Sequence, residues 1–97
     1  MSKVILSPRA KLDLSDIWDY TLGQWGAEQA EKYVRGLWAS MARAASDSTL
    51  SVEIDDVRKG YRKFRYGSHV IFYKMTGHGI DVVRILHQKM DFDRYMA

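Results

Sequence analysis

The fold class is decided by residues 61–87, which read YRKFRYGSHVIFYKMTGHGIDVVRILH. Three segments of this stretch are rich in aromatic and β-branched residues, the types that favour strands: residues 61–66, 69–75 and 80–87. Gly67-Ser68 separates the first two segments, and Thr76-Gly77-His78-Gly79 separates the last two. Glycine-serine between such segments suits a two-residue hairpin turn. The stretch therefore predicts a three-stranded antiparallel meander.

The chain upstream of the meander has helical periodicity. Residues 3–7 make a short β-branched run that is long enough for a strand, and Ser7-Pro8 has the pattern of a helix start. Apolar side chains then recur on one arc as far as Gly23 or Gly26, and the same periodicity resumes over residues 27–45. Two such helices joined by a short turn form a hairpin. Residues 46–56 lose the periodicity, and we expect them to form a long loop.

In chain order these elements predict an α+β fold with an N-terminal strand, an antiparallel helical hairpin and a three-stranded antiparallel meander. At 97 residues the chain has room for one hydrophobic core, so we expect a single domain over residues 1–97. No apolar run approaches the roughly 20 residues of a membrane span, and the N-terminal segment of residues 1–7 is too short for the apolar region of a signal peptide. We therefore expect a cytoplasmic protein with no membrane partner.

The formal net charge of +3 hides an uneven distribution. Residues 1–57 carry six basic and nine acidic side chains, whereas residues 58–97 carry nine basic and three acidic ones. Five of the basic residues form a cluster within eight positions: Arg58, Lys59, Arg62, Lys63 and Arg65. Such a cluster is typical of a surface for an anionic partner, either nucleic acid or an acidic protein segment. It is equally typical of a solvated edge strand.

The expected meander has apolar side chains on both faces. If both hairpins have two-residue turns, Phe64, Ile71 and Arg84 form one cross-strand row. A second row lies beside it on the same face: Arg62, Tyr73 and Val82. A one-residue bulge would swap the faces. One helical hairpin cannot cover both faces, so we expect one face to stay partly open in the monomer. An exposed apolar surface rimmed by basic side chains is typical of a docking site.

Metal and cofactor chemistry have little support in the sequence. The chain has no cysteine, which excludes disulfides and thiolate metal sites. His69, His78 and His87 could suggest a metal trio, but the meander places His78 roughly 30 Å from the other two. We expect no metal and no cofactor.

The three tryptophans fall on the helical core arcs, so we expect them in the core: Trp18, Trp25 and Trp38.

The candidate catalytic residues form an incomplete set. A ribonuclease needs a base, an acid and cations that stabilise the phosphorane charge. Arg62 and Arg84 suit the role of the cations, and His87 suits the acid or the base. No glutamate or tyrosine is placed by the sequence as the counterpart of His87. The alternative is that Arg84 and His87 serve only the strand that carries them.

Motifs along the whole chain are similar to those of one toxin family. The N-terminal half contains Leu6-Ser7-Pro8-Arg9-Ala10, Asp13-Leu14, Ile17-Trp18-Asp19-Tyr20 and Trp25-Gly26 with Ala30 and Tyr33. The second half contains Gly60-Tyr61-Arg62, Ser68-His69-Val70-Ile71-Phe72-Tyr73, Val83-Arg84-Ile85-Leu86-His87-Gln88 and Met90-Asp91. In this order the motifs resemble those of the ParE toxins within the RelE/ParE superfamily.

The resemblance implies the toxin of a bacterial type II toxin–antitoxin system, made with a ParD-like antitoxin whose C-terminal segment wraps the toxin. ParE proteins poison DNA gyrase, so the resemblance implies a non-catalytic protein with no direct nucleic-acid partner. The alternative is a RelE-like, ribosome-dependent mRNA endonuclease that works through Arg62, Arg84 and His87. The ribonuclease members carry further catalytic groups, including a late tyrosine. The incomplete set in this chain favours the gyrase hypothesis.

The antitoxin is expected to use both layers of the fold. We expect an amphipathic antitoxin helix against the hairpin and an extended segment that adds to the sheet. The expected contacts are Leu12, Trp18, Tyr33, Arg62, Tyr73 and Arg84. The basic cluster then suits an acidic antitoxin tail better than it suits nucleic acid.

Overall fold

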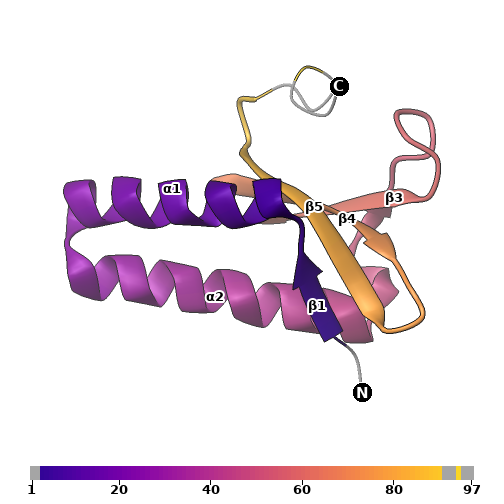
Figure 1. The fold of residues 1–97 in the computed structure, drawn as a ribbon, viewed down its shortest axis with the longest axis horizontal. Helices are drawn as coiled ribbons and strands as arrows, with labels where there is room; N and C mark the ends of the chain where they lie inside the picture. The colour runs from indigo at the N-terminus through magenta and orange to yellow at the C-terminus, as the bar shows by residue number, and fades with distance from the viewer. Residues whose placement is uncertain (1–2, 91–93, 95–97) are drawn as a thin grey trace.

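A helical hairpin packs against one face of a five-stranded sheet in the computed structural model, which describes residues 3–90 and 94 (Figure 1). The elements are β1 (Lys3–Leu6), α1 (Pro8–Trp25), α2 (Ala27–Ser46), a 3₁₀ helix (Ser48–Leu50), β2 (Val52–Glu53), β3 (Tyr61–Tyr66), β4 (His69–Met75) and β5 (Gly79–His87). The strand order is β1-β5-β4-β3-β2. Strands β3, β4 and β5 form the predicted antiparallel meander. The predicted α+β fold class is confirmed.

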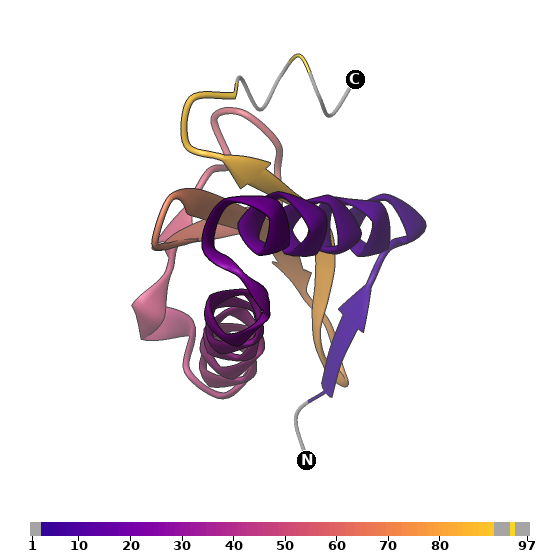
Figure 2. The same cartoon turned by 90° about the vertical axis from the view of Figure 1, so that its left-hand side faces the viewer.

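Strand β1 extends the sheet beyond the meander by pairing in parallel with β5. A parallel pair needs a long crossover connection, and here both helices lie within that connection. Seen along the hairpin, α1 and α2 run beside each other on one side of the strands (Figure 2). Neither helix, within the part of the chain that the structure describes, is long and apolar enough to cross a membrane.

Local signals set the ends of the two helices as predicted. The Ser7 hydroxyl accepts a hydrogen bond from the Ala10 amide at 3.0 Å, and Pro8 occupies the first turn of α1. Of the two glycines considered, Gly26 ends α1, with φ at 92°. This region of φ is accessible to glycine at low cost. The same residue precedes α2, so the hairpin turns within one residue.

The segment after α2 differs from the prediction of a long loop over residues 46–56. It contains the 3₁₀ helix and the short strand β2, which pairs with β3 through Val52 opposite Lys63 and Glu53 opposite Arg62. The pairing partners lie about ten residues downstream, so local periodicity does not indicate this strand. It was therefore not predicted from the sequence.

The register of the meander was predicted correctly between β3 and β4, and between β4 and β5 as far as the bulge. Arg62 stands opposite Tyr73, and Tyr73 stands opposite Val82, as expected for two-residue turns. A bulge then leaves Val83 without a partner, so Arg84 pairs with Phe72 and Ile85 replaces Arg84 opposite Ile71. The predicted cross-strand row that contains Arg84 is therefore wrong.

Apolar residues form one large and one small cluster. The larger cluster lies between the hairpin and the sheet and includes Leu37, Met41, Ile71, Tyr73 and Ile85. The smaller cluster lies on the outer face and buries Ile54, Phe72 and Leu86. Partly buried side chains complete it: Tyr61, Val70 and Val83.

Large apolar side chains are instead exposed on the hairpin. Trp25 is 71% exposed and Trp38 is 41% exposed, so the prediction that all three tryptophans belong to the core is wrong for these two. Trp18 is half-buried. Tyr20 and Leu12 are each 66% exposed. Periodicity identified the apolar arc of each helix, but the sheet is too short to cover the hairpin along its whole length (Figure 1).

We predict that Ser7→Ala lowers the free energy of unfolding by about 1 kcal/mol, since Ser7 caps α1 and also donates to the Val83 carbonyl at 2.9 Å. Urea denaturation of the two proteins measures the difference. Ser15→Ala is the matched control, because Ser15 is an exposed residue within the same helix. An equal effect of both substitutions would contradict the capping role.

Candidate functional site

A buried ion pair attaches α1 to the sheet at the bulge. The Arg84 guanidinium donates to Asp13 from Nε at 2.8 Å and from Nη2 at 2.9 Å. The Ile85 amide donates to the same carboxylate at 2.9 Å. The two side chains are 11% and 13% exposed, so water does little to weaken the pair. Arg84 therefore has a structural role, and its partner Asp13 was not indicated by the sequence.

One side of α1 borders a cleft of about 820 Å³, which we call the α1 cleft. It is lined by α1, by the start of α2 and by the ends of β4 and β5. Its inner part holds polar and ionisable groups: Asp13, Tyr33, His69, Arg84 and His87. Its rim includes the exposed side chains of Asp16, Tyr20 and Trp25.

Tyr33 and His69 make the polar contacts that close one end of the α1 cleft. The Tyr33 hydroxyl lies 2.7 Å from Nδ1 of His69, accepts from the Ser68 amide at 3.2 Å and donates to the Tyr66 carbonyl at 3.2 Å. Burial raises the pKa of Tyr33. Burial, followed by the neighbouring His87, lowers the pKa of His69. Both groups are therefore held in their neutral forms near neutral pH.

The other side of α1 borders a groove of about 610 Å³, which we call the β1 groove. It lies between β1 and the two helices, and its lining is mostly apolar, with Trp18 and Trp38 among the largest side chains. Lys11 and Ser15 are exposed polar residues that line it. Strand β1 is an edge strand, so the groove adjoins backbone groups that are free to pair with a further strand.

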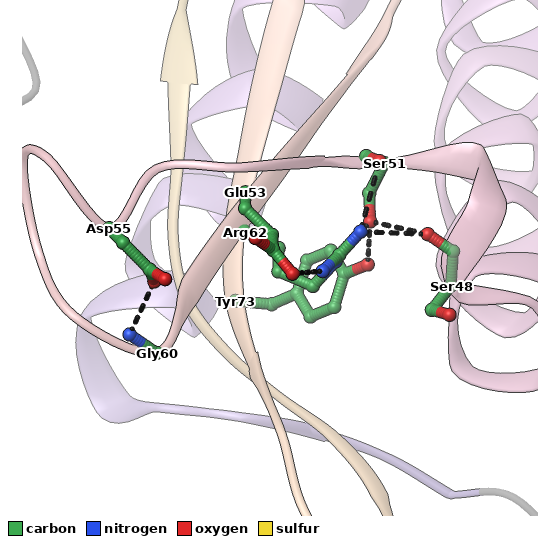
Figure 3. A network of polar contacts seen from close by, with 7 residues as sticks. All are labelled: Ser48, Ser51, Glu53, Asp55, Gly60, Arg62 and Tyr73. Carbon is green, nitrogen blue, oxygen red and sulfur yellow. Dashed lines mark hydrogen bonds and ion pairs between the residues drawn. The ribbon is translucent and has the colours of Figure 1, made fainter.

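Arg62 holds the segment after α2 against the sheet (Figure 3). Its guanidinium donates to the Ser51 hydroxyl at 2.8 Å, to Glu53 at 3.0 Å and to the Ser48 carbonyl at 3.1 Å. The Tyr73 hydroxyl donates to the same Ser51 hydroxyl at 2.5 Å. The Arg62 side chain is 18% exposed. These contacts fix the path of the chain between the end of α2 and β2.

The structure does not bring the three residues of the ribonuclease hypothesis together. Arg62 lies on β3 and binds residues 48–53, whereas Arg84 lies on β5 and binds Asp13 of α1. Only Arg84 and His87 line a common cleft. His69 stands opposite His87, with ring centroids 5.6 Å apart, and His78 pairs with Asp81 in the distant turn. Residues 3–90 and 94 contain no group of three or more side chains suited to a metal ion.

The six expected antitoxin contacts occupy different environments. Leu12 is exposed on α1, Trp18 lines the β1 groove and Tyr33 lines the α1 cleft. Tyr73 has no exposed surface, so its ring stabilises the core and the Arg62 network. Arg62 and Arg84 are engaged by carboxylates.

The basic cluster is also divided. Lys63 and Arg65 are exposed on β3, and Arg58 and Lys59 are exposed in the preceding turn, whereas Arg62 turns toward Glu53. Tyr20, Trp25 and Asp13 were not identified as site residues from the sequence. All three lie on α1, and nothing in the periodicity of this helix distinguishes them from other residues. Their common position at the α1 cleft is visible only in the three-dimensional structure.

We predict that Asp13→Ala lowers the free energy of unfolding by about 3–5 kcal/mol, because it removes the carboxylate that pairs with the buried Arg84 guanidinium. Thermal and urea denaturation measure this. The double variant Asp13→Leu with Arg84→Met should recover much of the loss, since an apolar pair leaves no buried charge. A single variant as stable as the wild type would show that the pair does not attach α1.

We predict that acidification destabilises the protein through His69. Its pKa in the folded state lies below the ordinary 6.5, so the stabilising contribution of the neutral ring is complete above that value and is lost as the pH falls. The free energy of unfolding should decrease between about pH 7 and about pH 5, and less steeply in His69→Gln. The charged and titratable neighbours, Asp13, Tyr33 and His87, are common to both proteins. Identical pH profiles would contradict this role.

The sequence matches the family model described as ParE toxin of type II toxin-antitoxin system, parDE, over residues 4–92. The chain is 50% identical over 94 residues to Toxin ParE1 of Mycobacterium tuberculosis (strain CDC 1551 / Oshkosh), with 96% of each chain covered. It is 43% identical over 86 residues to Toxin ParE1 of Caulobacter vibrioides, covering 89% of this chain and 88% of the relative.

A solved structure of the chromosomal ParDE TA system from P. aeruginosa has a similar fold, with a TM-score of 0.74. The similarity covers 90% of this chain and 96% of that chain at 19% sequence identity. The fold, the family match and the sequence identity of 50% and 43% to two ParE1 toxins agree with one another. The chain belongs to the ParE toxin family of type II toxin–antitoxin systems.

Proposed function

We propose that this toxin inhibits DNA gyrase by binding, without catalysis, and that a ParD-like antitoxin neutralises it in the cytoplasm. The observation that carries the proposal is the state of the two candidate catalytic cations. Arg84 forms an ion pair with Asp13. Arg62 forms an ion pair with Glu53 and donates hydrogen bonds to Ser48 and Ser51. Catalysis of phosphoryl transfer needs cations directed at the phosphate, and these two are directed at the protein.

The exposed surface of the hairpin suits binding instead. Tyr20 and Trp25 are more than half exposed, and aromatic residues contribute a large share of the binding energy in protein interfaces. Family membership supports a toxin. The resemblance to ParE proteins, which poison DNA gyrase, supports gyrase as the target. The alternative, a ribosome-dependent mRNA endonuclease, has Arg84 and His87 in a common cleft in its favour.

Two separate surfaces, the β1 groove and β3, suit the proposed antitoxin. The similar ParDE structure from P. aeruginosa supports a ParD-like partner. The β1 groove offers apolar side chains, an exposed lysine at position 11 and the free edge of β1. Lys63 and Arg65 present positive charge from β3. An acidic, amphipathic antitoxin segment would bury apolar residues in the groove and pair with these charges.

We predict that the purified toxin inhibits DNA supercoiling by gyrase and that its cognate ParD-like antitoxin restores supercoiling. A gel-based supercoiling assay measures both effects. Full gyrase activity at a large excess of folded toxin would overturn the proposed target.

The same preparation separates this function from the alternative. Translating ribosomes incubated with the toxin should retain intact message, because the two arginines are not directed at a common phosphate. Messenger cleavage that requires His87 would establish the endonuclease in place of gyrase inhibition.

A further inference from the structure

The helical hairpin is acidic over a long stretch of sequence on either side of its turn. Between Lys11 and Lys32 the chain has no basic residue and five carboxylates: Asp13, Asp16, Asp19, Glu28 and Glu31. Asp13 is neutralised by Arg84, and Glu31 lies 2.6 Å from Arg35. The remaining three carboxylates are exposed. This part of the hairpin therefore has the opposite charge to β3.

Asp16 is the acidic residue of this group that lies on the rim of the α1 cleft. It shares the rim with Tyr20 and Trp25, which are 66% and 71% exposed. Asp16 takes part in no ion pair within the described chain. The cleft thus combines a carboxylate and two aromatic side chains with a volume of about 820 Å³. Aromatic rings beside an unpaired carboxylate are complementary to a guanidinium group, which can stack on the rings and bind the carboxylate.

We propose that the α1 cleft binds an arginine-bearing basic segment of the toxin's target protein. The inference rests on the proposed function, since it takes gyrase as the target. The guanidinium would bind Asp16 while its planar face stacks on Trp25 or Tyr20. The aliphatic part of the arginine would lie over the apolar lining, which includes Ile17 and Leu86.

The charge distribution separates this partner from two others. Nucleic acid is disfavoured at the rim of the cleft, because the exposed Asp16 carboxylate repels phosphates. The acidic antitoxin segment fits the β1 groove and β3, which carry the exposed lysines and arginine. The two sides of α1 would therefore serve two different proteins. Target and antitoxin would compete only if their segments met across the helix.

The test reverses the charge at Asp16. Asp16→Lys should weaken inhibition of purified gyrase about tenfold or more, as expected for opposing a close charge pair in an interface. Asp19→Lys is the matched control, because it makes the same charge change three residues away on α1 and outside the cleft lining. Both positions are exposed, and circular dichroism checks that the variants fold. Trp25→Ala should weaken inhibition as well, whereas all three variants should bind the antitoxin as the wild type does.

The outcomes distinguish this inference from the proposed function. A wild-type toxin that leaves gyrase active overturns the function itself. A wild type that inhibits gyrase, with Asp16→Lys equally potent, overturns the cleft assignment alone. Equal losses in Asp16→Lys and Asp19→Lys would mean general charge repulsion and would also overturn it. Loss of antitoxin binding in Asp16→Lys would assign the cleft to the antitoxin instead.

Discussion

The contact between Asp13 and the Arg84–Ile85 segment determines how the two layers of this protein meet. One carboxylate accepts two hydrogen bonds from the guanidinium and one from the Ile85 amide, at the bulge where β5 changes register. A buried carboxylate and guanidinium are costly to separate, so α1 is held in one position on the sheet. The α1 cleft and the β1 groove lie on the two sides of this helix, and both depend on where the contact places it.

Much of the fold could be predicted because its signals are local. Ser7 caps a helix, Gly26 permits a sharp turn and Gly67-Ser68 closes a hairpin, each through contacts within a few residues. The bulge at Val83 could not be predicted, because both faces of β5 carry apolar residues and either register buries them. Strand β2 depends on pairing with β3 and on the Arg62 network, which local periodicity does not report.

The candidate site was less predictable than the fold. Arg84 was identified from the sequence as a chemically important residue, but its partner Asp13 lies 71 positions away. Trp25 and Trp38 lie on apolar arcs, yet both are exposed. Trp25 lies at the end of the hairpin that extends beyond the sheet, whereas Trp38 lines the open β1 groove (Figure 1). The structure also shows where the charged residues lie. The basic residues of β3 and the acidic residues of the hairpin lie on different elements, which suits a toxin with two protein partners of opposite charge.

We propose that this ParE-family toxin acts by occupying its target. The most direct measurement is the ratio of toxin to gyrase at which supercoiling stops, obtained by titrating the toxin at a gyrase concentration well above the dissociation constant. Binding without turnover predicts a sharp end point at a fixed molar ratio, followed by a plateau. Complete loss of activity at a small fraction of that ratio, increasing with incubation time, would mean that one toxin molecule acts repeatedly and would contradict the account.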